Sequence, residues 1–178
     1  MPWVRPSRRA SWRGARMATR DYEEFIAAFN GRGVRYLVAG AHAVAFHARP
    51  RATKDLDLFV EPTKANAELV LAALRDFFGG ADLGYEPEDV LDPGCVIQIG
   101  VAPVRIDVMC ALDGIDEFDA AWQRRSPGRF GQVETSYLGL SDLILAKEAA
   151  GRDQDRADLG PLRRAAARHG GRDAKPRR

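Results

Sequence analysis

The sequence has little cysteine and no long apolar run. Its 178 residues include two cysteines, Cys95 and Cys110, which cannot build a disulfide framework and which we expect to be buried free thiols of a reducing compartment. The longest apolar stretch, residues 36–46, is shorter than the roughly 18 residues of a transmembrane helix. These absences exclude a disulfide-stapled secreted domain and a membrane-spanning chain, and they predict one cytoplasmic domain.

Charge is distributed unevenly along the chain. Residues 1–20 contain six arginines and no acidic residue, and residues 161–178 contain seven basic residues and one acidic residue. Of the 27 basic and 25 acidic residues in the whole chain, residues 21–160 therefore keep 14 basic and 24 acidic, a net charge of −10. An acidic body favours cation binding, and basic ends favour contact with polyanions.

The two ends flank one central domain. No apolar segment follows the N-terminal arginines, so residues 1–18 lack the pattern of a secretory signal, and we expect a disordered basic extension there. An organelle transit peptide is the alternative for this acid-free segment. We place the folded domain at residues 19–162, and a basic helix end and tail at residues 163–178.

Helix and strand signals alternate within the domain. Asp21 with Glu24 predicts a capping box, and Thr63 and Ser141 are predicted N-caps. Two adjacent strand patterns predict an antiparallel hairpin that interrupts the βα alternation. We therefore expect an α+β fold, a small mixed β-sheet backed by helices. The expected helices span 21–30, 40–48, 63–78, 116–125, 141–150 and 153–168, and the expected strands span 34–38, 55–61, 95–100, 104–110 and 133–138.

The most informative feature is the pair Asp55 and Asp57. Residues i and i+2 of a strand project from the same face, so their carboxylates are expected side by side while the intervening leucines are buried. Such a pair repels unless a cation lies between the two or one takes a proton. Asp107, on a later predicted strand, adds a third carboxylate if the two strands are neighbours, and Mg²⁺ prefers oxygen ligands of this kind. A solvated strand face is the alternative.

A turn suited to phosphate precedes the acidic strand. The strand 34–38 leads into Ala39, Gly40 and Ala41, where a short helix is predicted to begin. Glycine lets backbone N–H groups approach an anion closely, and a helix N-terminus attracts negative charge. A phosphate-holding turn, a metal-holding strand and a third carboxylate thus follow one another in order.

This order resembles the nucleotidyltransferase superfamily, whose fold is that of the DNA polymerase β palm. The family pattern is a glycine followed by serine or glycine, a short helix, an Asp-x-Asp strand and a third aspartate on a later strand. Gly40, Asp55, Asp57 and Asp107 match this pattern. Residues 49–58, R-P-R-A-T-K-D-L-D-L, are similar to the matching segment of small bacterial members.

A second motif lies in residues 141–159, S-D-L-I-L-A-K-E-A-A-G-R-D-Q-D-R-A-D-L. It resembles a segment of the AbiEii-type transferases, toxins of toxin–antitoxin and phage-abortive systems, at Lys147, Arg152, Asp155 and Asp158. An ion pair between Arg152 and one of these aspartates is expected to be structural. The two motifs together are specific where either alone is not, and the resemblance covers about residues 21–162.

The resemblance implies an Mg²⁺-dependent transferase that moves a nucleoside monophosphate from an NTP to a hydroxyl group. It assigns Asp55 and Asp57 to the nucleotide-bound Mg²⁺, and Asp107 to a second metal position and to activation of the attacking hydroxyl. The acceptor is RNA, such as a tRNA end, a protein or a small molecule, and a cognate antitoxin is a further expected partner. The basic ends favour a nucleic acid.

Five residues are the expected nucleotide contacts, namely Gly40, Ala41, Arg51, Thr53 and Lys147. The turn acts through its backbone, and Arg51 and Thr53 either touch phosphate or brace the loop. Lys147 lies in the apolar stripe of its helix and needs an anion, which by resemblance is the triphosphate. A snorkelling lysine at the stripe edge is the alternative, and no core contact is expected to depend on its charge.

One residue departs from the family pattern. Ala41 stands where many active members have serine or glycine, so a hydroxyl that can hold a phosphate oxygen is missing while the backbone donors remain. This departure favours an alternative function, a non-catalytic nucleotidyltransferase-fold module that binds a partner protein or a nucleotide. A nuclease that uses the same three carboxylates is a third possibility.

Overall fold

A computed structural model describes residues 19–50, 53–101 and 104–173. The predicted basic extension and Arg51 lie outside these ranges. None of the described helices combines the length and the apolar composition that a bilayer crossing needs. Both cysteines are free; Cys110 is buried and Cys95 is partly buried.

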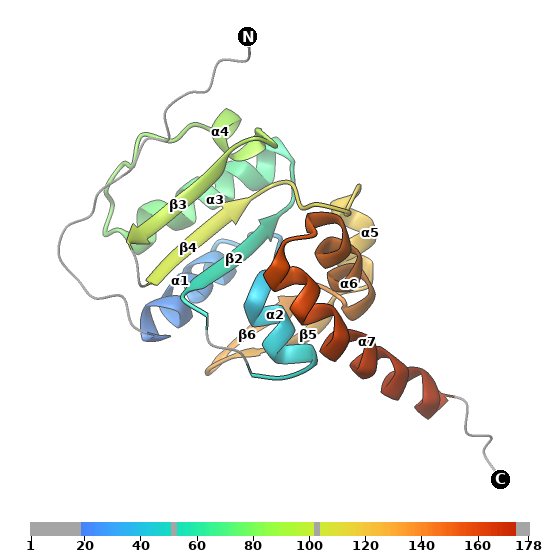
Figure 1. Cartoon of the computed structure of the whole chain (residues 1–178). Coiled ribbons are helices and arrows are strands. Elements are labelled where there is room, and N and C mark those ends of the chain that lie inside the picture. The colour runs from blue at the N-terminus through green and yellow to red at the C-terminus, as the bar shows by residue number, and fades with distance from the viewer. Residues whose placement is uncertain (1–18, 51–52, 102–103, 174–178) are drawn as a thin grey trace.

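Six strands form one mixed sheet in the order β3–β4–β2–β1–β6–β5, which confirms the predicted α+β class (Figure 1). β2 pairs in parallel with β4 and antiparallel with β1, so ladders on both sides hold it in place. The expected hairpin is the antiparallel pair β3–β4. The strands are β1 (Tyr36–Val38), β2 (Asp55–Val60), β3 (Val96–Val101), β4 (Val104–Met109), β5 (Ser126–Phe130) and β6 (Val133–Tyr137).

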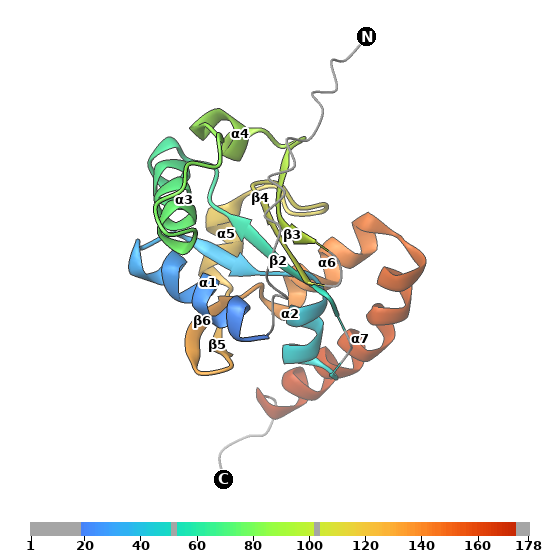
Figure 2. The ribbon, with the colours of Figure 1, turned by 90° about the vertical axis from the view of Figure 1, so that its left-hand side faces the viewer.

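Helices cover both faces of this sheet. Figures 1 and 2 show α1 and α3 on one face and α2, α6 and α7 on the other. Leu56 and Leu58 of β2 are fully buried, and they alternate with the less buried Asp55 and Asp57, as predicted. The described helices are α1 (Thr19–Gly31), α2 (Gly40–His47), α3 (Lys64–Phe77), α4 (Pro87–Leu91), α5 (Phe118–Gln123), α6 (Leu140–Ala150) and α7 (Asp153–Asp173).

Two predicted helix starts are wrong and one is confirmed. Asp21 lies in the first turn of α1, which begins at Thr19, rather than at its N-cap. Gly139 is the N-cap of α6, so Ser141 lies inside the helix, and no side chain among the described residues caps it. Thr63 caps α3, because its hydroxyl accepts a hydrogen bond from the Asn66 N–H at 3.3 Å.

The sequence patterns missed α4 and β5 and ended α7 too early. The Ser-Pro-Gly start of β5 is typical of a loop, yet β5 pairs antiparallel with β6 at the sheet edge, where proline is tolerated. α7 continues to Asp173 rather than to residue 168. It contains Pro161, and the neighbouring Leu162 and Ala165 are buried, so tertiary packing outweighs the local helix-breaking signal.

Candidate active site

The predicted acidic residues lie on one face of the two central strands. The parallel register places Asp57 opposite Asp107 and Asp55 opposite Arg105. This confirms that β2 and β4 are neighbours and that a third carboxylate stands beside the Asp55–Asp57 pair. We call Asp55, Asp57 and Asp107 the acidic cluster.

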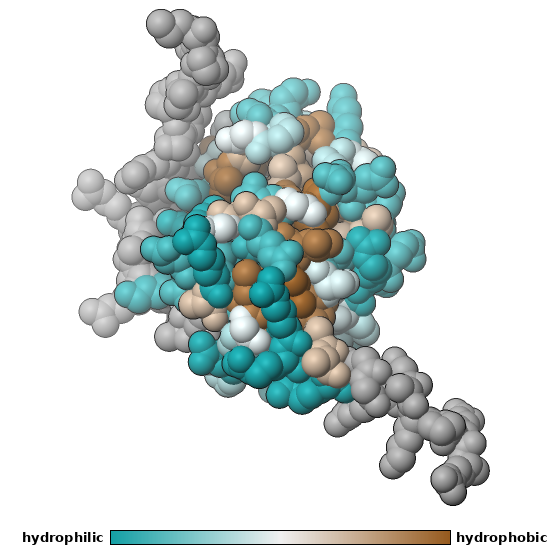
Figure 3. All heavy atoms as spheres, turned by 45° about the vertical axis from the view of Figure 1, so that its right-hand side comes forward, coloured by the Kyte–Doolittle hydropathy of each residue, from teal (hydrophilic) through white to brown (hydrophobic). Residues whose placement is uncertain are grey.

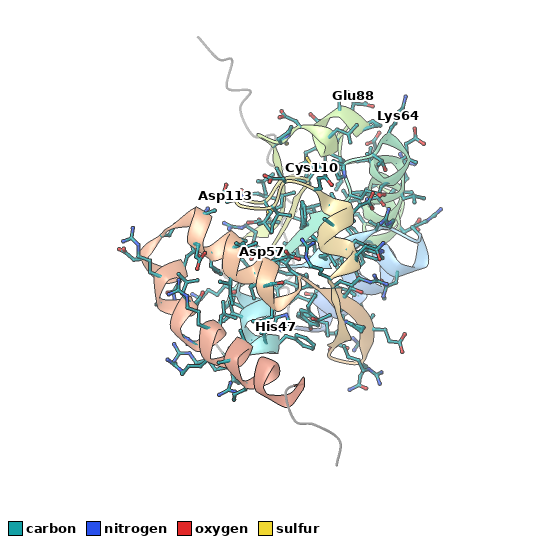
Figure 4. All side chains as sticks on the ribbon, turned by 90° about the vertical axis from the view of Figure 1, so that its right-hand side faces the viewer. His47, Asp57, Lys64, Glu88, Cys110 and Asp113 are labelled. Atoms are coloured by element: carbon teal, nitrogen blue, oxygen red, sulfur yellow. The ribbon has the colours of Figure 1, made fainter. Side chains whose placement is uncertain are left out.

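Asp57 connects the acidic cluster to the turn at Gly40. It lies near the centre of the molecule, between the sheet and the helices on its second face (Figure 4). Gly40 has φ of +56°, and a Cβ atom there would be 1.8 Å from Asp57 Oδ2, so the carboxylate lies directly against the glycine backbone. The Ala39 N–H donates a hydrogen bond to the Asp57 carbonyl oxygen at 2.9 Å. A glycine is therefore required at this position for both backbone conformation and space.

The first turn of α2 is suited to bind an anion. Its N-cap, Ala39, offers no side-chain oxygen, so no side chain of the described residues caps the helix. The first N–H groups of a helix have no partner within it, and they carry the positive end of the helix dipole. Ala41 is buried in this turn and has no polar side-chain atom, so its backbone N–H is the group that it can offer to an anion.

Negative charge exceeds positive charge in the acidic cluster. Burial, together with the charges of Asp107 and Asp55, raises the pKa of Asp57 to about 6. Lys147 and Arg105 act in the opposite direction but do not compensate. Burial also raises the pKa of Asp107 against the effect of its contact with Arg105. The acidic cluster therefore takes up a proton more readily than an isolated carboxylate does, and at neutral pH its excess negative charge favours a bound cation.

Arg105 is a site residue that the sequence analysis did not assign. Its Nη2 donates hydrogen bonds to Asp107 Oδ2 at 2.9 Å and to Asp55 Oδ2 at 3.4 Å. Its Nε lies 2.8 Å from Asp107 Oδ1, an ion-pair contact in which the N–H is not aligned for a hydrogen bond. The i, i+2 spacing of Arg105 and Asp107 was a visible signal, but the contact with Asp55 depends on the register of two strands.

The donor set of the acidic cluster fits a hard divalent cation. Three carboxylates on adjacent strands are the ligands that Mg²⁺ prefers. Asp107 Oδ1 is buried and accepts no hydrogen bond from the described residues, so it keeps a lone pair that a cation can use. As the described side chains stand, however, no group of three or more His, Cys, Asp or Glu residues is arranged to hold a metal ion. Arg105 already binds two of the three carboxylates.

Lys147 belongs to a second charged cluster that joins α6 to α7. Its Nζ donates to Asp155 Oδ1 at 2.6 Å and lies 3.2 Å from Asp158 Oδ2, and all three residues are buried. We call these three residues the α6–α7 cluster. The protein itself thus supplies anions for Lys147, and the expectation that no core contact depends on its charge is wrong. A triphosphate contact of Lys147, which also influences Asp57, stays a prediction.

Thr53 and Arg152, both named in the sequence analysis, have structural contacts, and so has His42 of α2. Thr53 Oγ1 donates to the Asp55 carbonyl oxygen at 3.2 Å and accepts from the Asp55 N–H at 3.3 Å, so it braces the entry into β2. Arg152 Nε lies 4.0 Å from Asp155 Oδ2, as expected for a structural ion pair. His42 lies against the rings of Tyr22 and Phe130, and burial lowers its pKa to about 4.

An apolar hollow lies elsewhere in the molecule. It occupies about 470 Å³ between α6 and α7 and is lined by Leu140, Ser141, Ile144, Leu145 and Ala166. Figure 3 shows apolar residues surrounded by hydrophilic ones on this side of the molecule. The hollow includes neither the acidic cluster nor the turn at Gly40, and its lining has no titratable side chain.

A glycine turn, a helix N-terminus and carboxylates on two adjacent parallel strands define the class, a chain with a nucleotidyltransferase-like fold. Residues 18–173 match the model of a family described as "Nucleotidyl transferase of unknown function (DUF2204)", and the chain belongs to this family. No curated protein matches the chain. The predicted superfamily is thereby confirmed, while the AbiEii-type assignment stays a prediction.

Proposed function

We propose that this protein is a metal-dependent nucleotidyltransferase that moves a nucleoside monophosphate from an NTP to a hydroxyl acceptor. Family membership supports the reaction class. The observation that carries the proposal is the position of the Asp57 carboxylate, which lies against Gly40 at the start of α2 and beside Asp107. A triphosphate bound at that helix terminus would have its phosphates next to the acidic cluster.

Each residue of the site has a role in this proposal. Asp55 and Asp57 would hold an NTP-bound Mg²⁺, and Asp107 would share a second ion and accept the proton of the attacking hydroxyl. The ions, when bound, neutralise charge on the attacking and leaving oxygens. The backbone N–H groups of Gly40 and Ala41 would bind phosphate oxygens, so positioning rather than covalent chemistry is the main task of the protein.

Pyrophosphate release tests the reaction. The protein is incubated with Mg²⁺ and each NTP in turn, with total RNA as the acceptor; released pyrophosphate is quantified directly, and a radiolabel on the α-phosphate follows the transferred nucleoside monophosphate. Asp57→Asn should reduce transfer by about a hundredfold or more, because a neutral amide is a poor ligand for Mg²⁺. Asp116→Asn, which removes the same charge from an exposed position, should behave as wild type. Robust transfer by Asp57→Asn would contradict the mechanism.

For the acceptor we propose RNA, with a tRNA end as the first candidate. The support is electrostatic: α7 exposes Arg156, Arg163, Arg164 and Arg168, and arginines on one helix can follow a phosphate backbone. Gel analysis of the labelled products separates RNA from protein as the acceptor. Label that enters protein alone would overturn the RNA assignment and leave the transferase in place.

We also propose an AbiEii-type toxin role, with a cognate antitoxin as partner, on the resemblance of residues 141–159. Inducible expression in a bacterial host tests this role. Wild type should arrest growth and Asp57→Asn should not, because the arrest requires transfer. Unimpaired growth at a high level of wild-type protein would contradict it.

A non-catalytic module is the second candidate function. Two observations favour it: Ala41 lacks the hydroxyl found in many active members, and Arg105 binds two carboxylates of the acidic cluster. Such a module would bind NTP without releasing pyrophosphate. Equilibrium dialysis with labelled NTP, run beside the pyrophosphate assay, therefore separates the two functions.

A further inference from the structure

Arg105 lies where its charge meets two carboxylates from different strands. It projects from β4 on the face of the sheet that carries the acidic cluster, directly opposite Asp55 in the parallel register. Both oxygens of Asp107 lie within 2.9 Å of its guanidinium nitrogens, whereas Asp55 is reached at 3.4 Å. Asp107 has 9% of its side chain exposed and Asp55 has 42%. The contact with Asp107 is therefore strong, and the contact with Asp55 is screened by solvent.

This contact uses the same oxygen atoms that a divalent cation would need. The guanidinium donates a hydrogen bond to Asp107 Oδ2 and its Nε lies 2.8 Å from Asp107 Oδ1, so a positive charge already stands beside both oxygens, where a coordinated cation would lie. As the described acidic residues stand, they form no group that could hold a metal ion, so the side chains of the acidic cluster must rearrange when a cation binds. Cation binding and the Arg105 ion pairs are therefore alternatives at Asp107.

Arg105 also relieves repulsion within the acidic cluster. Three carboxylates share one sheet face, and Arg105 contacts two of them with its positive charge. Without a positive charge at this place, the mutual repulsion would increase. A cation in the cluster would supply the same relief and would leave the guanidinium free to move away.

We propose that Arg105 is the internal counter-ion of the metal-free acidic cluster, and that binding of a divalent cation displaces its guanidinium from Asp55 and Asp107. The inference rests on the proposed function, because it assumes a cation in the cluster. It assigns Arg105 as a positioning residue that sets the cation concentration at which the site fills. The opposite role, in which Arg105 orders the carboxylates for the cation, predicts weaker cation binding when Arg105 is removed.

Direct cation binding separates these two roles. Free Mn²⁺ is measured by electron paramagnetic resonance during titration of nucleotide-free protein. Arg105→Gln should bind Mn²⁺ about fivefold or more tightly than wild type, because a competing positive charge has been removed at short range. Arg105→Lys, which keeps the charge but loses the two-pronged contact, should lie between the two. Arg32→Gln, which breaks the exposed ion pair with Asp76, should match wild type.

Thermal unfolding supplies a second readout, which does not depend on activity. Metal-free Arg105→Gln should unfold at a lower temperature than wild type, and saturating Mn²⁺ should remove the difference. If Arg105→Gln does not fold without metal, refolding on addition of Mn²⁺ and the affinity of Arg105→Lys decide. An Arg105→Lys protein that binds Mn²⁺ no more tightly than wild type would then overturn the proposal.

The outcomes also separate this inference from the proposed function. Equal or weaker Mn²⁺ binding by Arg105→Gln, with pyrophosphate release intact in wild type, overturns the counter-ion role alone. Failure of wild type and both Arg105 variants to bind Mn²⁺ overturns the counter-ion role and the metal dependence together. Tighter binding by Arg105→Gln without any pyrophosphate release supports the counter-ion role and contradicts the transferase.

Discussion

The acidic cluster and the α6–α7 cluster differ in charge balance. In the α6–α7 cluster the Lys147 ammonium pairs with Asp155 and Asp158, and Arg152 adds a second positive charge at its edge. The acidic cluster has three carboxylates and one paired cation, Arg105. A balanced cluster holds two helices together, whereas an unbalanced one has room for positive charge from a ligand. This difference supports a structural role for the α6–α7 cluster and agrees with the chemistry proposed for the acidic cluster.

Removing the charge of Lys147 should have the largest effect, and it should fall on stability. Lys147→Met removes the buried ammonium that pairs with Asp155 and Asp158, which should lower the free energy of unfolding by about 3–5 kcal/mol. Urea unfolding followed by circular dichroism measures the change. Arg163→Gln, which removes an exposed ion pair between the same two helices, is the control and should cost less than about 1 kcal/mol. A stable Lys147→Met protein would mean that the α6–α7 cluster is not structural.

Acid titration should expose two opposed contributions to stability. The pKa of Asp57 is raised to about 6, so the native state binds more protons than the unfolded state between about pH 4 and 6, and this residue lowers stability as pH rises. The pKa of His42 is lowered to about 4, so the unfolded state binds more protons between about pH 4 and 6.5, and this residue raises stability as pH rises. The two contributions should largely cancel in the wild type.

Single variants remove one contribution at a time. As pH rises from 4 to 7, the free energy of unfolding of metal-free Asp57→Asn should increase by about 2–3 kcal/mol relative to that of the wild type, because the variant lacks the carboxylate that Asp55 and Asp107 repel. Over the same pH range, the free energy of unfolding of His42→Gln should decrease by a similar amount relative to that of the wild type. Urea unfolding at pH 4.5, 5.5 and 7 measures both differences. If the free energy of unfolding of Asp57→Asn changes with pH in the same way as that of the wild type, the pKa of Asp57 is not raised in the folded protein.

Substitution of Gly40 should break the acidic cluster while sparing the α6–α7 cluster. In Gly40→Ala the new methyl group would overlap Asp57 Oδ2, so the carboxylate must move, and transfer should fall about a hundredfold. Gly33→Ala is the matched control, because Gly33 has a similar φ of +69° but a methyl group added there would meet nothing within 4 Å. Both variants should lose about 1–2 kcal/mol of stability from backbone strain. Comparable transfer by the two variants would contradict the placement of the site.

The smallest effect is expected at Ala41. Ala41→Ser restores a hydroxyl in the first turn of α2, and a hydrogen bond to a charged group contributes about 1.5–3 kcal/mol. NTP affinity, measured by equilibrium dialysis, should therefore increase about tenfold. Unchanged affinity would mean that the turn does not hold phosphate. The difference in charge balance between the two clusters would then be the remaining support for a ligand site at the acidic cluster.

Local sequence patterns predicted much of the fold and part of the site. The alternation of Asp55 and Asp57 with buried leucines, the glycine at the start of α2 and the β3–β4 hairpin all follow from short-range periodicity and turn chemistry. The same reasoning failed for β5, whose proline and glycine indicate a loop, because pairing with β6 decides that segment. The helix starts at Asp21 and Ser141 failed because a capping residue has its effect only at the actual helix end.

The sequence by itself determined that two carboxylates share a strand face and that a glycine turn precedes them, because i, i+2 spacing and backbone freedom are properties of adjacent residues. Only the tertiary structure decided which charges meet. Arg105 contacts Asp55 through the register of β2 with β4, and Lys147 contacts Asp155 and Asp158 through the packing of α6 on α7. Ion pairs act over a few ångströms in space irrespective of separation along the chain, so the charge balance of each cluster is a property of the folded protein.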